Sequence, residues 1–221
     1  NIEIINNIAK GARLPGMGSR YRGSGGGVLI INSDPIFTDI NITNNYAGEY
    51  GAGVYALYSS PIFNNFIISG NVGSGNLQKG GGVLCEGTPN AIFIDGSILD
   101  NGNADIGLAP YMGGGIFVGP APFDSSSSFY AQLINVNIFS NVSRMWGGGV
   151  AGSGISISGG TIKENTATYF GGGVYQGGHI YSLGNIDFSP LNRVSVYSNT
   201  VDDSNAIGND IFSESFLDVV L

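Results

Sequence analysis

A short phrase that recurs along the whole chain constrains its fold more than any other feature of the sequence. The phrase opens with a glycine corner, in which a run of glycines (once Gly-Ala-Gly) precedes an aliphatic residue. The aliphatic residues of the six clear copies are Val28, Val54, Val83, Ile116, Val150 and Val174. A degraded seventh copy, GNDIF, ends in Ile211 and Phe212. Such a repeat predicts a stack of similar structural units.

The second part of the phrase is a large apolar residue, followed by Ile or Val five positions later and by Asn three positions after that. The six sets are Phe37/Ile42/Asn45, Phe63/Ile68/Asn71, Phe93/Ile98/Asn101, Leu133/Ile138/Asn141, Ile157/Ile162/Asn165 and Leu191/Val196/Asn199. The phrase is constant but the connections between copies differ in length, which favours a parallel β-helix whose insertions leave the coils at the corners. The sequence therefore predicts an all-β fold, a single parallel β-helix of about seven coils.

Alternation along the strands assigns each apolar position to the interior or the exterior. The aliphatic residues after the corners, the large apolar residues and the Ile or Val residues are expected to form three inward columns. The Asn residues are expected to stack as a ladder, because an Asn amide both donates and accepts hydrogen bonds. The expected ladder consists of Asn7, Asn45, Asn71, Asn101, Asn141, Asn165 and Asn199.

We expect residues 1–221 to form one β-helical segment without a second domain. The main insertions are expected near 8–24, 104–112, 119–131 and 176–190, where the repeat is interrupted. An open end of a β-helix carries unpaired strand edges. The chain is therefore expected to be part of a longer polypeptide or to stack end to end in an assembly.

The corners resemble the repeats of the polymorphic outer-membrane protein family. The phrases that carry the resemblance are GAGVYALYSS, FGGGVY and GNDIF, and the pattern extends over nearly the whole chain. The chain departs from the family pattern by using Gly-Gly-Gly more often than Gly-Gly-Ala, and Ile rather than Phe before the Asn. The resemblance implies a right-handed parallel β-helix that is secreted or displayed on a cell surface, commonly as an adhesin.

Composition and residue counts disfavour several other classes of function. The net charge of −8 leaves no basic patch for nucleic acid or for an anionic membrane, and no apolar run is long enough for a transmembrane helix. The single histidine, His179, and the single cysteine, Cys85, cannot form a metal site by themselves. GGGVAG at 147–152 belongs to a corner and is not followed by a helix that could bind a phosphate. We expect no cofactor.

An enzyme acting on polysaccharide is the alternative to a non-catalytic module. Asp39 and Asp95 fall in one column two coils apart, roughly 9–10 Å by the strand spacing. That separation is near the upper end for the two carboxylates of an inverting glycosidase. Asn65 lies between them, however, and all three positions are suited to turns. The sequence leans toward a non-catalytic function.

A stripe of outward apolar residues is the expected contact surface. These residues directly follow the aliphatic residues of the corners and are Leu29, Tyr55, Leu84, Phe117 and Tyr175. Long exposed apolar stripes mark interaction sites, and the alternative is that an insertion covers the stripe. The expected partner is a protein or a glycan on a surface, or another copy of the chain.

Two sequons for N-glycosylation occur in the chain, at Asn41 and Asn141. Asn41 is the expected acceptor because it should face solvent, whereas Asn141 belongs to the ladder. Taken together, these features predict an extracellular or cell-surface β-helical module that acts as an adhesin or as a structural filament component.

Overall fold

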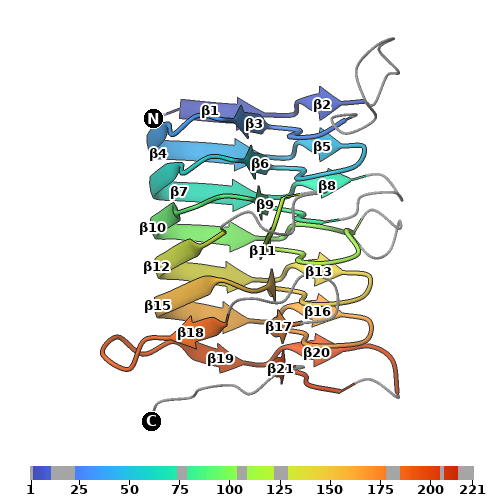
Figure 1. The fold of residues 1–221 in the computed structure, drawn as a ribbon. Helices are drawn as coiled ribbons and strands as arrows, with labels where there is room; N and C mark the ends of the chain where they lie inside the picture. The colour runs from blue at the N-terminus through green and yellow to red at the C-terminus, as the bar shows by residue number, and fades with distance from the viewer. Residues whose placement is uncertain are drawn as a thin grey trace.

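The computed structural model describes residues 2–10, 23–73, 79–103, 109–121, 129–177, 185–204 and 207–213. It is a parallel β-helix, and in the described residues all regular structure is β-strand. The coils are stacked from β1 (Ile2–Ile5) at one end to β21 (Ile211–Ser213) at the other (Figure 1). Every pairing between strands is parallel, as the repeat predicts.

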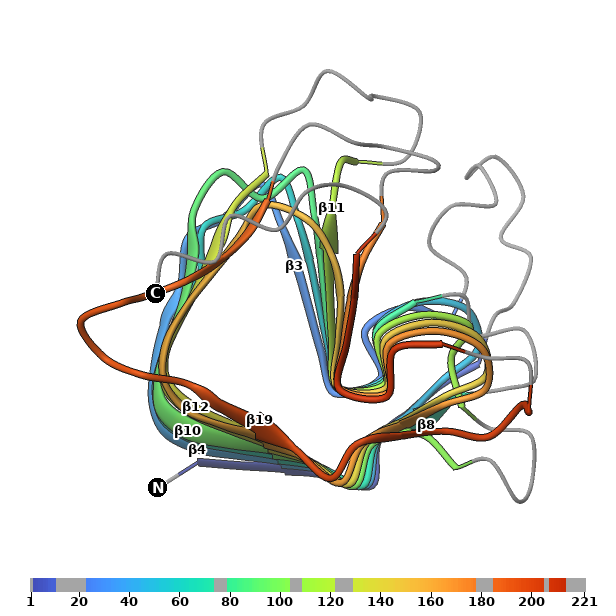
Figure 2. The same cartoon turned by 90° about the horizontal axis from the view of Figure 1, so that it is seen from below.

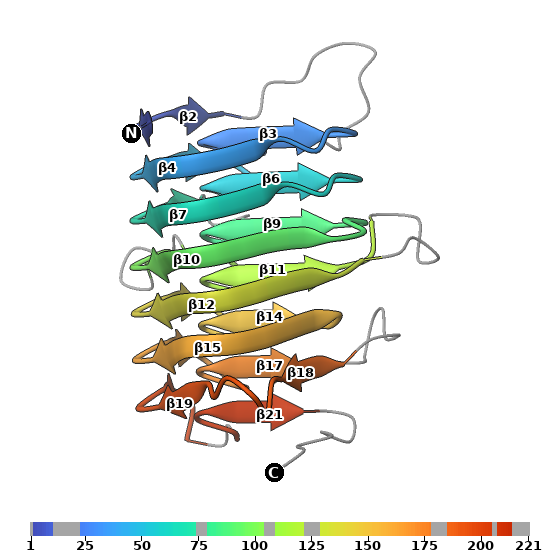
Figure 3. The same ribbon diagram turned by 90° about the vertical axis from the view of Figure 1, so that its left-hand side faces the viewer.

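The longest strands form one eight-stranded sheet along the rod (Figure 3). After β1, its members are β4 (Ile36–Thr43), β7 (Ile62–Ser69), β10 (Ala91–Leu99), β12 (Ala131–Phe139), β15 (Ile155–Lys163), β18 (Ile186–Phe188) and β19 (Ser195–Tyr197). Both β18 and β19 pair with β15, so the last coil interrupts this wall. We call this sheet the long-strand sheet.

A seven-stranded sheet follows the glycine corners. It contains β3 (Val28–Ile31), β6 (Val54–Leu57), β9 (Val83–Glu86), β11 (Ile116–Gly119), β14 (Val150–Gly152), β17 (Val174–Gln176) and β21. Two-residue strands that follow the long strands form two further sheets. These are β2 (Ile8–Ala9), β5 (Tyr46–Ala47) and β8 (Val72–Gly73) in one, and β13 (Val142–Ser143), β16 (Thr166–Ala167) and β20 (Thr200–Val201) in the other. Figure 2 shows that a coil runs counterclockwise while it advances toward the viewer, so the β-helix is right-handed.

The interior contains the predicted apolar columns. Val54, Val83, Ile116, Val150 and Val174 are paired in register from coil to coil and fully buried. In the second column the ring of Phe63 stacks on those of Phe37 and Phe93, with centroids 4.7 and 5.1 Å apart. Stacked side chains of similar shape can pack closely in such a narrow interior.

One predicted member of the second column is wrong. Leu191 is 97% exposed, and Phe188 instead pairs with Ile157. The last coil leaves the wall between β18 and β19, so Leu191 lies on the excursion and only Val196 returns to register, opposite Ile162. Leu191 and Val196 therefore have the five-residue spacing of the repeat, but Leu191 does not occupy the inward position that this spacing indicates in the other coils.

The predicted Asn ladder is confirmed and runs through the coils as a continuous line of hydrogen bonds. From Asn45 to Asn165, each Nδ2 donates to Oδ1 of the next Asn and to the main-chain oxygen of an Ile residue one coil earlier, at 2.9–3.0 Å. Each main-chain N–H of these Asn residues donates to the same Oδ1. The five amides are fully buried, so every one of their polar groups depends on the neighbouring coils.

The glycine corners and the ladder meet where the coil narrows. In Figure 2 the wall of corner strands turns back at the centre of the coil, close to the end of the long strands. A Cβ atom on Gly82 would lie 2.9 Å from both the Nδ2 of Asn101 and the Cγ2 of Ile98. A side chain at this position would therefore push the two walls apart. The first position of each corner requires glycine for a different reason. Its backbone has a positive φ in every corner, for example +66° at Gly80, and glycine adopts this conformation without strain.

The single segment with its four insertions stays a prediction, and two of the predicted insertion ranges contain strands. β2 lies within 8–24, and β18 lies within 176–190. Much of the four ranges is outside the described residues.

We predict that Asn71→Ala lowers the free energy of unfolding by about 1–2 kcal/mol, because it leaves partners in both neighbouring coils unpaired. Asn64→Ala is the matched control. Asn64 lies on the same strand, β7, but is exposed, so its loss should change stability by less than about 0.5 kcal/mol. Chemical denaturation measures both, and equal effects would contradict a structural role for the ladder.

Candidate functional site

The predicted outward stripe exists as a column, but it is not an exposed surface. Leu29, Tyr55, Leu84, Phe117 and Tyr175 occupy equivalent register positions on the outer side of the corner strands. Leu84 is fully buried, and Tyr55, Phe117 and Tyr175 are 1–5% exposed. Only Leu29 is exposed, at 42%. The expectation of a solvent-facing binding stripe is therefore wrong for four of its five members.

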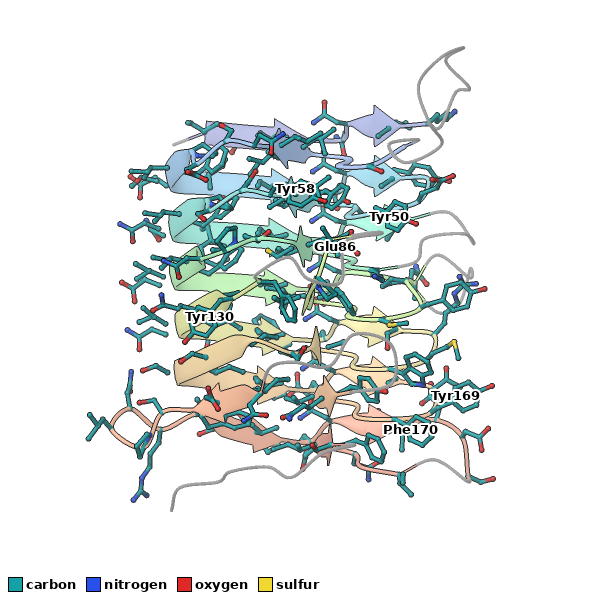
Figure 4. The ribbon with its side chains drawn as sticks, in the orientation of Figure 1. Tyr50, Tyr58, Glu86, Tyr130, Tyr169 and Phe170 are labelled. Carbon is teal, nitrogen blue, oxygen red and sulfur yellow. The ribbon has the colours of Figure 1, made fainter. Side chains whose placement is uncertain are left out.

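A second column of the same chain covers this stripe. The residue directly before each glycine corner pairs with its counterpart in the next coil by a parallel bridge. The column consists of Ser24, Tyr50, Lys79, Met112, Trp146, Phe170 and Ile207. Tyr50, Met112, Trp146 and Phe170 pack against the stripe. We call these seven residues the covering column; Figure 4 shows Tyr50 beside the upper coils and Phe170 beside the lower ones.

Aromatic stacking joins the two columns in the lower coils. The ring of Trp146 stacks on Tyr175 with centroids 5.4 Å apart, and Tyr175 in turn stacks on Phe212 at 5.7 Å. The ring of Phe170, which also belongs to the covering column, stacks on Phe212 with centroids 4.8 Å apart. The residues that sequence alone suggested as a docking surface thus form a second, external apolar core between two walls of the same rod.

A buried ion pair anchors the covering column in the upper coils. Lys79 Nζ lies 2.7 Å from Oε1 of Glu86, whose side chain is fully buried on β9. Tyr55 Oη donates to Oε2 of Glu86 at 2.9 Å, and Lys79 Nζ also lies 4.7 Å from the centre of the Phe117 ring. The carboxylate therefore has a partner on each oxygen, which offsets the loss of its hydration. In Figure 4 Glu86 is labelled near the middle of the rod, to the left of Tyr50.

A partly open hollow lies over β11, β14 and β17 beside the covering column, and its volume of about 430 Å³ includes space that is open to solvent. Its largest lining side chains are Lys79, Met112, Phe117, Trp146 and Tyr175, and Ser153 adds a small polar group. Gly119, Gly152 and Gly177 also line the hollow and contribute no side chain to fill it. The rings of Phe117 and Tyr175 lie against Gly119 and Gly177, where a Cβ atom would collide with them. The hollow has the apolar walls and few polar groups typical of a ligand pocket.

The candidate carboxylates Asp39 and Asp95 lie outside this groove, on a bend of the long-strand sheet. Both are exposed and have positive φ values, +54° and +52°. Each accepts a hydrogen bond from an Asn side chain of the next coil, Asp39 from Asn65 and Asp95 from Asn135. Their observed role is to form a turn and to join neighbouring coils, which agrees with the turn position assigned from the sequence.

Two other chemically reactive residues were considered from the sequence. Cys85 is buried in the main core as predicted, and burial, with a smaller contribution from the charge of Glu86, raises the pKa of its thiol to about 12. The thiolate nucleophile is therefore suppressed at neutral pH. His179 lies outside the described residues. Within the described ranges no cluster of three or more His, Cys, Asp or Glu side chains could hold a metal ion.

The two sequons differ in their surroundings. Asn141 is fully buried, and its amide bonds with Asn101, Asn165 and two main-chain oxygens, so it has no free nitrogen for a glycan. Asn41 is half-buried on the outer side of β4, between Glu3 and Ile67 of the adjacent coils. Asn41 remains the predicted acceptor.

Sequence reasoning missed Lys79, Glu86 and Trp146. A signal was available, because a large side chain stands directly before five of the six clear corners and also before the degraded copy. Comparison of the chain with models of protein families, with curated proteins and with solved structures found no match. No helix that could cross a membrane occurs among the residues placed by the structure.

We predict that Lys79→Met lowers the free energy of unfolding by about 3 kcal/mol, because it leaves the buried carboxylate of Glu86 without its cation. Adding Glu86→Gln to this variant should restore most of the loss, since Gln keeps an acceptor for Tyr55 without a charge. Thermal and chemical denaturation of the two variants measure the difference. A double variant less stable than Lys79→Met alone would contradict the proposed compensation.

Proposed function

We propose that this chain is a secreted or surface-displayed, non-catalytic β-helical module that acts as an adhesin or as a component of a structural scaffold. The observation that carries the proposal is the apolar hollow at β11, β14 and β17, which lies beside an external apolar core formed by the stripe and the covering column. A preformed cavity on a rigid support binds without the entropic cost of ordering its walls. The repeat resemblance supports the same location and role.

The lining of the hollow favours an apolar group of a protein partner over a sugar. Its polar groups are few: the ammonium of Lys79, which is already paired with Glu86, the hydroxyls of Ser153 and Tyr175, and the indole N–H of Trp146. A sugar ring brings several hydroxyl groups, and each would need a hydrogen-bond partner once buried. An aromatic or aliphatic side chain needs none, and it can pack on the rings of Phe117, Trp146 and Tyr175.

Trp146 is the only tryptophan of the chain and lines the hollow, so its fluorescence reports occupancy directly. We expect short peptides with a Phe or Leu side chain to change the emission of Trp146 in a saturable manner. Ser153→Leu, which adds an apolar side chain to the wall, should weaken this response at least tenfold.

Ser158→Leu on the outer side of β15 is the matched control and should leave the titration unchanged. A response to neutral oligosaccharides but not to peptides would favour a glycan-binding adhesin. No response to either class, or an undiminished response of Ser153→Leu, would contradict a binding role for the hollow.

The polysaccharide-active alternative depends on Asp39 and Asp95 acting on one substrate. Their positions on an exposed bend, with an oxygen of each bonded to an Asn amide, favour the structural role. We expect that Asp39→Asn combined with Asp95→Asn changes no activity toward neutral or acidic glycans. Reducing-sugar release from such glycans measures this, and cleavage that the double variant abolishes without unfolding would instead establish the enzyme.

A further inference from the structure

The last glycine corner differs from the six before it in a way that has a structural cause. Its first glycine is kept, since Gly208 has the same positive φ (+76°) as the first glycines of the other corners. The third position is glycine in all six earlier corners but aspartate here, because Gly173 corresponds in register to Asp210. The sequence comparison treats GNDIF as a degraded copy, but its backbone forms an intact corner.

The next coil explains why the third position is glycine in the other corners. In each of the six, a Cβ atom would lie 2.7–3.1 Å from the Nδ2 of the following ladder Asn, as at Gly173 and Asn199. It would also approach the main-chain oxygen of the following corner. A side chain is compatible with this position only where no ladder Asn follows.

The side chain of Asp210 takes the place that a ladder Asn has in the other coils. Its Oδ1 accepts from the main-chain N–H of Asn199 at 3.0 Å and from Asn199 Nδ2 at 2.9 Å. These are the same two hydrogen bonds that Asn199 Oδ1 accepts from Asn165 one coil earlier. The neighbouring Asn209 accepts in the same way from the main-chain N–H of Val201 on the edge strand β20.

We infer that Asn209 and Asp210 terminate the β-helix and close its C-terminal face to end-to-end contact with a further parallel coil, including a coil of a second copy. The two side chains accept hydrogen bonds from N–H groups of Asn199 and Val201, and a further coil would need these same donors to pair with this face. A carboxylate also offers no N–H group with which the ladder could continue, whereas an Asn amide would. End-to-end association through the ladder is thus restricted to the opposite face, where the exposed Asn7 donates inward to Asn45.

Hydrogen exchange tests the cap itself. In Asp210→Ala the main-chain amide of Asn199 should exchange at least tenfold faster than in the unchanged protein. In Asp210→Asn it should stay slow, because Oδ1 is kept. Asp187→Ala is the control, an exposed carboxylate on the last coil outside the ladder. Equal exchange of Asn199 in all four proteins would overturn the assignment.

Sedimentation tests the closed face. Asp210→Asn replaces one carboxylate oxygen with an NH₂ group, which can donate to the Asn7 oxygen of a second copy. We expect concentration-dependent association of Asp210→Asn but not of the unchanged protein, and we expect Asn7→Ala to abolish it. An Asp210→Asn variant that sediments like the unchanged protein at every concentration, with the fold verified by circular dichroism, would overturn the inference.

Discussion

The close approach of the glycine corners to the Asn ladder is the constraint on which the rest of the structure depends. The walls of a coil meet where Gly82 faces Asn101, and a single added carbon atom would separate them. Because the walls meet there, the coil has a narrow waist, and the corner strands turn their outer side toward the residues that precede the corners. The main core, the external apolar core and the hollow all follow from this one contact.

The waist also explains why the outward stripe is covered. Alternation along a strand correctly separates Val54 from Tyr55, but it assumes that the side opposite the core faces water. In this fold the chain folds back on the far side of the waist, and Tyr50 packs against Tyr55 with ring centroids 6.0 Å apart. The outer side of the corner strands is therefore part of a second buried apolar layer and not a polar surface.

The repeat is sufficient to predict the coils, the inward columns and the ladder, because these depend on fixed spacings that every coil shares. Features of single coils were harder to predict. Leu191 fits the spacing but lies on an excursion of the last coil, and Lys79 and Glu86 find each other only through the fold of the covering column. Asp210 departs from the glycine pattern, and its side chain accepts the two hydrogen bonds from Asn199 that a ladder Asn accepts elsewhere. Positions that follow the repeat thus predict the core, whereas positions that depart from it indicate the features of single coils.

The ladder has a direction that gives the two ends of the rod different electrostatic character. The bonds that join one Asn side chain to the next all point the same way, with the N–H of one Asn directed toward the oxygen of the next, from Asn7 to Asn199. Aligned amide dipoles sum along their axis, as peptide dipoles do in an α-helix. The positive end of this side-chain dipole lies at the last coil, where Asn199 Nδ2 donates to the negatively charged carboxylate of Asp210. The rod thus carries an internal polarity that favours anions at its C-terminal end and cations at its N-terminal end.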